Sequence, residues 1–554
     1  MVLLTEVSPY LQVLAGQKVT GLPDNTYAGT VQYTERAQDI LQRLGEVDPD
    51  VLEHDDYLTY AMFRDMLQAA VEAQQYFWHG FNITPYAVGS SASMVLPVVL
   101  GTSTFESDED IDYYLGFLRD IARYFSDDLT RIAGQEERDI LLPQGALSGA
   151  RTAISGVGDM TRALTVIAPE RMTALDDTQR ERLTSGIEEI LASEIQPAIN
   201  ALLDYIGEGY ESRAPVAVGL GQYPGGDEAY RYAIRRQTTM DLDPQEIHDQ
   251  GLAYMASLQE RMAEIRTEMG FEGTQAEFHE QMRGNPRFYA ETPEEVEETY
   301  MAYVRKIEPL IGDYFSVMPK APYGVKRLEP AQEPGLTFGL YQPPSPTEPV
   351  GNYRYNGSKL ESRPLIWAAA LIYHELIPGH HFHIALQRER EDISEFRRTT
   401  SLMYAAFTEG WANYAASLAG EMGLLDDPWD QYGWLLFDAF ITNRLVVDTG
   451  MNYLGWSLEQ AREYMLANTF SSAEEVATET LRYSTDMPAQ ALAYKLGFEK
   501  IRAIRKTQEE RLGDAFDIKK FHAATVGSGG LPLPLLELHV DWYMNELNES
   551  AKTD

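Results

Sequence analysis

The sequence predicts a mainly α-helical protein with one small β-sheet, on three observations. Apolar residues recur at intervals of three and four over most of the chain, with charged residues on the opposite face, which is the period of amphipathic helices. Residues that favour helix starts precede several of these stretches. Strand-like alternation is confined to one region.

Helices are expected wherever this period is sustained. The expected segments are Thr34–Leu44, Tyr57–Phe77, Ile111–Ile132, Asp177–Ile206, Pro244–Met269, Pro293–Ile311, Ser401–Met422, Trp429–Asn452, Leu458–Ala467 and Ala489–Thr507. Asp243 and Ser457 are suited to cap the helices that follow them. Pro244 and Pro428 fit first-turn positions, where the backbone N–H has no helical partner.

The exception to the helical period lies just before the most histidine-rich part of the chain. Leu336–Tyr341 and Gly351–Asn356 carry β-branched or aromatic residues on either side of the proline-rich stretch Gln342–Pro349. This pattern predicts a hairpin. An extended peptide could pair with its edge by strand addition, which binds backbone with little sequence preference. The simpler alternative is a hairpin that only packs on the helices.

Composition excludes several classes of function. The 554 residues carry a formal net charge of −40 and no cysteine. Such acidity disfavours nucleic acid, whose phosphates would be repelled. Without cysteine, histidines and carboxylates are the strong transition-metal ligands that remain. No apolar run approaches a membrane span, and Met1–Glu6 lacks the features of a signal peptide. We therefore expect no nucleic-acid or membrane partner and a cytoplasmic location.

Four of the ten histidines lie within Tyr373–His383, directly after the apolar run Pro364–Tyr373. A buried His-Glu pair costs several kcal/mol of desolvation unless a partner or a metal satisfies it. Here Glu375 follows His374, as in zinc peptidases whose motif places two histidines four residues apart on a helix, with the intervening glutamate as general base. The segment therefore predicts zinc-dependent hydrolysis.

The spacing departs from that motif, because Pro378 occupies the fourth position after His374. In an unbroken helix His380 would lie about 9 Å along the axis from His374, too far to share one ion. Proline removes a helical hydrogen bond, and the following glycine permits unusual backbone angles. We expect a bulged helix that brings His380 to the metal and turns His381 elsewhere. His383 is the alternative ligand in place of His374.

A third ligand is needed, since catalytic zinc sites take three protein ligands and keep one position open. Glu409 is the candidate, because it is a lone carboxylate among small and aromatic residues in the expected helix Ser401–Met422. With His374, His380 and Glu409 as ligands of one Zn²⁺ ion, Glu375 would take the proton of the attacking water.

Four motifs occur in a fixed order along the chain. They are His374–His381 (HELIPGHH), Glu409–Ala412 (EGWA), Arg444–Gly450 (RLVVDTG) and Gln490–Gly497 (QALAYKLG). In this order they resemble the signatures of the bacterial family called domain of unknown function 885 (DUF885). The resemblance runs over most of the chain and is strongest from about Gly351 to Leu538.

Members of that family resemble helical zinc peptidases such as thimet oligopeptidase, angiotensin-converting enzyme and carboxypeptidase Taq, in which two histidines and a downstream glutamate hold zinc. The resemblance implies one domain over residues 1–554 in two lobes, with a helical part over about 1–320 and a metal-site part over about 321–554. It also implies a deep channel that admits short peptides. Two positions depart from the family pattern: Asn452 stands where a histidine is common, and Ala489 where glycine is usual.

Other residues of these motifs have two readings each. Tyr494 could hydrogen-bond a developing oxyanion, or it could be a packed core tyrosine. Arg444 could bind a substrate carboxylate, but an ion pair with Asp448 at i+4 is favoured. The remaining candidates for substrate contact or support of the ligands are His381, His383 and Lys495. The histidines outside the segment, expected in structural or surface positions, are His54, His79, His248, His279, His522 and His539.

The function expected from these features is that of a zinc metallopeptidase, of oligopeptidase or carboxypeptidase type, that cleaves short peptides as a monomer or homodimer. Two alternatives remain. A metal-dependent amidohydrolase acting on small amino-acid conjugates would keep the same ligands. A non-catalytic binding protein with a structural metal would close the fourth coordination position with His381 or His383.

Overall fold

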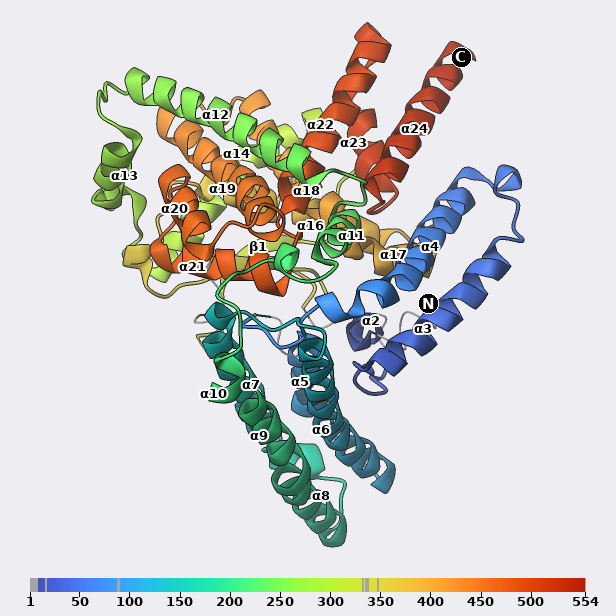
Figure 1. Ribbon diagram of the computed structural model, residues 1–554. Coiled ribbons are helices and arrows are strands. Elements are labelled where there is room, and N and C mark those ends of the chain that lie inside the picture. Colours follow the sequence, from blue (N-terminus) through green and yellow to red (C-terminus); the bar gives the residue numbers. More distant parts are fainter. Residues whose placement is uncertain are drawn as a thin grey trace.

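The computed structural model describes residues 8–14, 17–86, 90–330, 333, 338–345 and 348–553. In this part of the chain the protein is mainly α-helical with a small three-stranded sheet, as predicted (Figure 1). The first helices are α2 (Pro9–Leu14), α3 (Tyr27–Leu44), α4 (His54–Ala73), α5 (Ser90–Thr102), α6 (Asp108–Glu136), α7 (Gln144–Leu164), α8 (Asp177–Ile190), α9 (Gln196–Tyr205), α10 (Glu208–Glu211), α11 (Gly226–Thr238), α12 (Pro244–Glu268), α13 (Gln275–Arg283) and α14 (Pro293–Tyr314). After the sheet follow α15 (Ala368–Glu375), α16 (His380–Glu389), α17 (Glu395–Thr400), α18 (Ala405–Glu421), α19 (Pro428–Asn452), α20 (Leu458–Asn468), α21 (Ala473–Leu481), α22 (Leu492–Leu512), α23 (Ile518–Gly527) and α24 (Leu533–Thr553).

The predicted caps form. The side chain of Asp243 accepts hydrogen bonds from the backbone N–H groups of the first turn of α12, and Ser457 makes a capping box with Gln460 at the start of α20. Most of the expected helices form with shifted bounds, and two examples illustrate this. A π turn, Leu191–Ile195, separates α8 from α9, and α18 begins at Ala405, after a short 3₁₀ turn.

The apolar side chains form two large cores. One is made mainly by α5 to α9 and α11. Helices α5 to α9, with the short α10, extend as a group from the rest of the molecule (Figure 1). The other contains α12, the sheet and most of α14 to α24, and it holds the histidine-rich segment. Leu445 of α19 and Leu492 and Leu496 of α22 belong to the first core, so these two helices join both. The division into two lobes near residue 320 stays a prediction.

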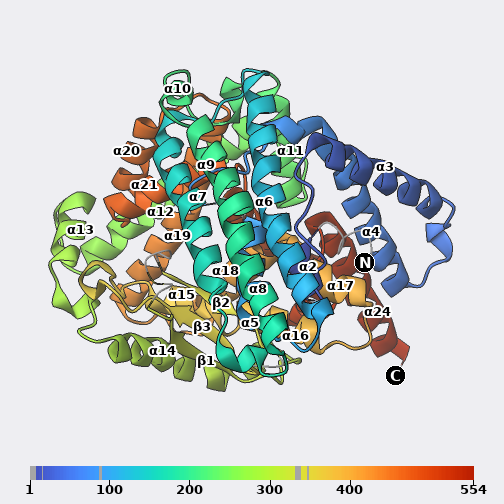
Figure 2. The ribbon, with the colours of Figure 1, turned by 90° about the horizontal axis from the view of Figure 1, so that it is seen from below.

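The sheet has the order β1-β3-β2, with β1 (Tyr323–Arg327) parallel and β2 (Gly339–Gln342) antiparallel to the central β3 (Gly351–Tyr355). Strands β2 and β3 form the predicted hairpin, although residues 336 and 337 lie outside the described residues. The sequence analysis missed β1. The sheet lies beside α14 and α15 when the molecule is seen from below (Figure 2). Strand β2 is at an edge of the described sheet.

No helix in the described part of the chain is both long and apolar enough to cross a membrane.

Candidate metal centre

The helix is interrupted between His374 and His380. Helix α15 ends at Glu375 and α16 begins at His380, and the Ile377–Pro378 peptide bond between them is cis. The indole N–H of Trp411 donates to the Pro378 carbonyl oxygen at 3.1 Å. The bulged helix expected from the sequence is therefore wrong: proline ends one helix and a second helix starts in a new direction.

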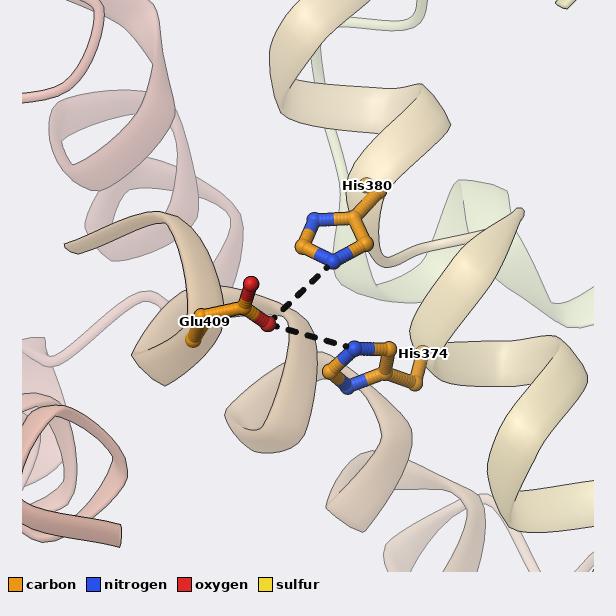
Figure 3. Close-up of side chains that lie close together, drawn as sticks. All are labelled: His374, His380 and Glu409. Carbon is orange, nitrogen blue, oxygen red and sulfur yellow. Dashed lines mark ion pairs between the residues drawn. The ribbon is translucent and has the colours of Figure 1, made fainter. Parts of the chain in front are cut away.

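This break brings three predicted ligands together, as Figure 3 shows. His374 Nε2 and His380 Nε2 lie 3.5 and 3.4 Å from Glu409 Oε2. One ligand atom from each of the three residues lies within 4.8 Å of the others. Zinc bonds to nitrogen and oxygen are about 2.0–2.2 Å long, which puts tetrahedral ligand atoms about 3.3–3.6 Å apart. The donor set and its spacing therefore fit one metal ion.

Neighbouring side chains orient both imidazoles. His374 Nδ1 lies 3.0 Å from Asn413 Oδ1, and His380 Nδ1 lies 3.4 Å from His383 Nε2. Since the Nδ1 atoms are occupied in this way, the Nε2 atoms face Glu409. Such contacts fix the tautomer and ring direction of metal-binding histidines. His383 thus lies behind His380 and outside the group of three, so the alternative set with His383 in place of His374 is not the one that the fold assembles.

His381 faces the sheet. Its Nδ1 accepts from the Tyr341 hydroxyl at 2.9 Å, and its Nε2 donates to the Ala321 carbonyl at 3.1 Å. Burial lowers the pKa of His381 to about 4, so the ring is neutral near pH 7. The histidine therefore ties α16 to β2 rather than turning toward the metal ligands.

The electrostatics of the three ligands favour a cation. Burial opposes ionisation of Glu409, but the charges of His380 and His374 and hydrogen bonds from both rings outweigh it and hold the pKa of that carboxyl well below its usual range. Burial also opposes the charged form of His380, yet the charge of Glu409 raises the pKa of that imidazole. A buried carboxylate that is ionised next to two imidazoles needs a positive partner, which protons or a metal can supply.

A family model described as "Bacterial protein of unknown function (DUF885)" matches residues 9–540. The chain belongs to this family. Two solved structures have the same fold as this DUF885 protein. A "putative lipoprotein" from Colwellia psychrerythraea is 24% identical with a TM-score of 0.84, over 97% of this chain and 94% of that one. A "putative lipoprotein of unknown function" from Shewanella oneidensis is 16% identical with a TM-score of 0.76, over 97% of both chains. No curated protein matches the chain.

The three ligands of the DUF885 protein open onto a cavity of about 600 Å³. Its apolar wall is formed by Phe338, Leu340, Trp367, Leu371, Phe437, Phe440 and Ile441, and its polar lining includes Tyr341, Glu375, Thr408, Arg444, Glu479, Arg482 and Tyr494. The volume lies within the range of about 300–1,000 Å³ that is usual for small-molecule sites.

Glu375 and Tyr494 both line the cavity onto which His374, His380 and Glu409 open. Burial raises the pKa of Glu375, and the nearby charge of Glu409 raises it further, while His374 and His380 act in the opposite direction. Burial and the charge of Glu409 also raise the pKa of Tyr494, so its hydroxyl keeps its proton near neutral pH.

Arg444 pairs differently from the prediction. Its Nε donates to the Tyr483 hydroxyl at 2.8 Å and its Nη2 lies 3.3 Å from Glu479 Oε2. Asp448 instead accepts hydrogen bonds from Tyr230, Asn452 and the backbone N–H of Ala489. The expected pair of Arg444 with Asp448 is therefore wrong, because partners from other helices outcompete the local one.

Lys495 is not among the residues that line the cavity. Its ammonium group lies 2.7 Å from Asp438 Oδ1 and 3.1 Å from Glu499 Oε1. Asn452, which stands where the family commonly has histidine, accepts from the Leu220 N–H and donates to the Tyr483 carbonyl, so it joins distant parts of the fold.

Sequence reasoning missed four supporting residues. Trp411 and Asn413 follow Glu409 on the same helix at i+2 and i+4, and both contact the interrupted segment His374–His380. Trp411 lies within the EGWA motif and Asn413 directly follows it, which was a usable signal. Glu479 and Arg482 of the cavity wall lie outside the four motifs, and no local pattern marks them.

The other histidines mostly pack inside the protein, as expected. His248, His279, His522 and His539 are buried. His54 and His539 contact each other, with 2.8 Å between Nε2 and Nδ1. No third ligand joins them within the described residues.

Proposed function

We propose that this protein is a zinc-dependent peptidase that hydrolyses short peptides. The single observation that carries the proposal is the convergence of His374, His380 and Glu409 at the wall of a cavity that Glu375 also lines. When bound there, Zn²⁺ supplies Lewis-acid activation of a carbonyl and of water. Two histidines and one carboxylate are the ligand set of several zinc peptidases. Within the described residues, no fourth histidine or carboxylate completes the group, which favours an open catalytic site over a closed structural one.

Glu375 acts in this proposal as the proton carrier. It immediately follows the ligand His374, and its carboxylate makes no hydrogen bond with a described residue, so it can accept one from water. It would take a proton from the attacking water and deliver it to the leaving amine. Tyr494, protonated and at the same wall, would donate its hydroxyl hydrogen bond to the oxyanion as negative charge develops.

Strand β2 supports a peptide as the substrate. Gly339, Leu340 and Tyr341 of this edge strand line the cavity beside the three ligands. An extended peptide could pair with the free side of β2, which would hold its backbone in place with little dependence on its sequence. The size of the cavity suits short peptides and not folded proteins.

A peptide digest with controlled metal content tests the proposal. The protein is stripped with a chelator and given back one equivalent of zinc, and each form is incubated with a mixture of short peptides and with acylated amino acids. We expect the zinc form to cleave peptides and the stripped form to be inactive. Hydrolysis that survives the chelator would refute the proposal. Cleavage of the acylated amino acids alone would assign the site to the alternative amidohydrolase.

Compartment and assembly are part of the same proposal. We place the protein in the cytoplasm as a monomer or homodimer. The names of the two structural neighbours suggest a lipoprotein as the alternative, and cell fractionation distinguishes the two.

A further inference from the structure

Two arginines share one carboxylate at the wall of the cavity. Arg444 comes from α19, and Arg482 begins the π turn Arg482–Asp486 after α21. Their Nη2 atoms lie 3.3 and 3.0 Å from the same atom, Oε2 of Glu479. All three residues line the cavity that contains the metal ligands.

This cluster has more hydrogen-bond donors than its contacts use. Two guanidinium groups face one carboxylate, and they carry more N–H donors than their contacts with Glu479 and Tyr483 use. The Nε of Arg482 is buried and has no hydrogen-bond partner within the described residues. Arg444 is 6% exposed. A partly buried guanidinium cluster with unused N–H donors is stabilised by an anion that enters the cavity and accepts hydrogen bonds from them.

The cluster lies at a defined distance from the metal ligands. On α19, Phe437 packs against His374, with 5.8 Å between ring centroids, and Arg444 is seven residues further on the same face. Seven residues of helix span about 10 Å. The Arg444 guanidinium carbon lies 4.3 Å from the ring centroid of Tyr494, which lines the same cavity as the metal ligands. An extended peptide advances about 3.3 Å per residue, so this span corresponds to about three residues of an extended peptide.

We infer that Arg444 and Arg482 bind the C-terminal carboxylate of a short peptide. This inference rests on the proposed function. Arginine binds carboxylates through two parallel N–H donors, which gives geometric selectivity as well as affinity. Phe440 lies under the Arg444 guanidinium, 4.5 Å from its carbon, and with Phe437 and Ile441 provides an apolar wall for the side chain of the terminal residue.

Three matched probes test which carboxylate is recognised. The peptide Ala-Ala-Phe has a free C-terminus, Ala-Ala-Phe amide lacks it, and Ala-Ala-Glu amide offers only a side-chain carboxylate. We expect the zinc-loaded protein to cleave the free acid with a kcat/KM at least about tenfold above either amide, because a hydrogen bond to a charged group is worth about 1.5–3 kcal/mol. Equal cleavage of the acid and its amide would overturn the inference while the proposed function stands. Preference for the glutamate amide would overturn the C-terminal assignment.

Variants connect this preference to the two arginines. Arg482→Met should remove most of the preference for the free acid by raising KM, and Arg482→Lys should restore part of it. Arg462→Met is the matched control, since Arg462 on α20 contacts Thr480 and does not line the cavity. Thermal unfolding of each variant shows whether it is folded.

A binding measurement separates this inference from the proposed function. Calorimetric titration of Ala-Ala-Phe and its amide into the Glu375→Gln protein reports affinity without turnover. Tighter binding of the acid that Arg482→Met abolishes supports the carboxylate site, even if the wild-type protein cleaves none of the probes. Equal binding of acid and amide refutes it.

Discussion

Gly410 of α18 and Gly497 of α22 lie against each other where the two helices cross. A Cβ atom on Gly410 would lie 2.5 Å from the carbonyl carbon of Gly497, and one on Gly497 would lie 2.9 Å from the Gly410 Cα. Only glycine permits so close an approach of two backbones. The crossing sets the position of Glu409 on one helix relative to Tyr494 on the other, so the metal ligand and the proposed oxyanion donor depend on it.

The crossing should not tolerate a methyl group. We expect Gly497→Ala to lower the free energy of unfolding by about 3 kcal/mol, because the helices must separate. Gly420→Ala is the control on α18, since the added Cβ would lie 3.9 Å from its nearest neighbour, Leu425. That change should shift stability by less than about 1 kcal/mol. Urea denaturation measures both, and equal effects would show that the crossing is not tightly packed.

Asn413 should control metal affinity without binding the metal. Its side-chain oxygen lies 3.0 Å from His374 Nδ1. Asn413→Ala removes the partner that fixes this ring, and we expect zinc to bind about 10–100-fold more weakly. Competition with a chromophoric chelator gives the affinity. Asn468→Ala, in a helix away from the cavity, is the control, and an unchanged affinity in Asn413→Ala would contradict the assigned orientation of His374.

Glu375 should be needed for turnover but not for metal binding. In Glu375→Gln the side chain keeps its size but cannot carry a proton, so we expect zinc content near that of the wild type and a loss of hydrolysis of about 10²-fold or more. Elemental analysis and peptide digestion measure the two properties on the same sample. Retained turnover would remove Glu375 from the proposed chemistry.

Acid should destabilise the protein through its buried histidines. Burial lowers the pKa of His522 to about 3, helped by the charge of Arg505, while its ring bridges the Tyr414 hydroxyl and the Tyr314 carbonyl. The unfolded chain takes up a proton below about pH 6.5 and the folded ring does not, so this histidine's contribution to stability is complete above that pH and is lost as pH falls toward 3.

The expected slope for one such histidine is about 1.4 kcal/mol per pH unit. Urea denaturation at several pH values between about 6.5 and 4 should therefore give a shallower pH dependence for His522→Asn than for the wild type. An unchanged slope would mean that the ring is protonated in the folded protein. His279 and His539, whose pKa values burial also lowers to about 3, should steepen the overall acid transition.

Local patterns predicted most of the helices, because an amphipathic period and a capping residue are properties of neighbouring positions. Strand β1 was not predicted. Its five residues pair in parallel with a strand more than twenty positions away, and such pairing leaves no local sequence pattern. The proline in the HELIPGHH motif correctly predicted an interrupted helix. It did not give the form of the interruption, which depends on the Trp411 hydrogen bond to Pro378.

Ligand types were easier to predict than their surroundings. His374, His380 and Glu409 stand out by chemistry and spacing, and the fold brings them together. The partner of Arg444 was predicted wrongly, because helical spacing favours Asp448 whereas the fold brings Glu479 from α21. Ala489, at the usual glycine position, has a φ of 68° and uses its N–H to bind Asp448, a contact that the sequence alone does not reveal.

The central claim is that His374, His380 and Glu409 hold one metal ion with an open coordination position. An anomalous-scattering map of zinc-loaded crystals, recorded at the zinc absorption edge, tests it most directly. We predict a single peak about 2.0–2.2 Å from His374 Nε2, His380 Nε2 and a Glu409 carboxylate oxygen, with no fourth protein ligand. A peak elsewhere, no peak, or a shell closed by another protein side chain would contradict it.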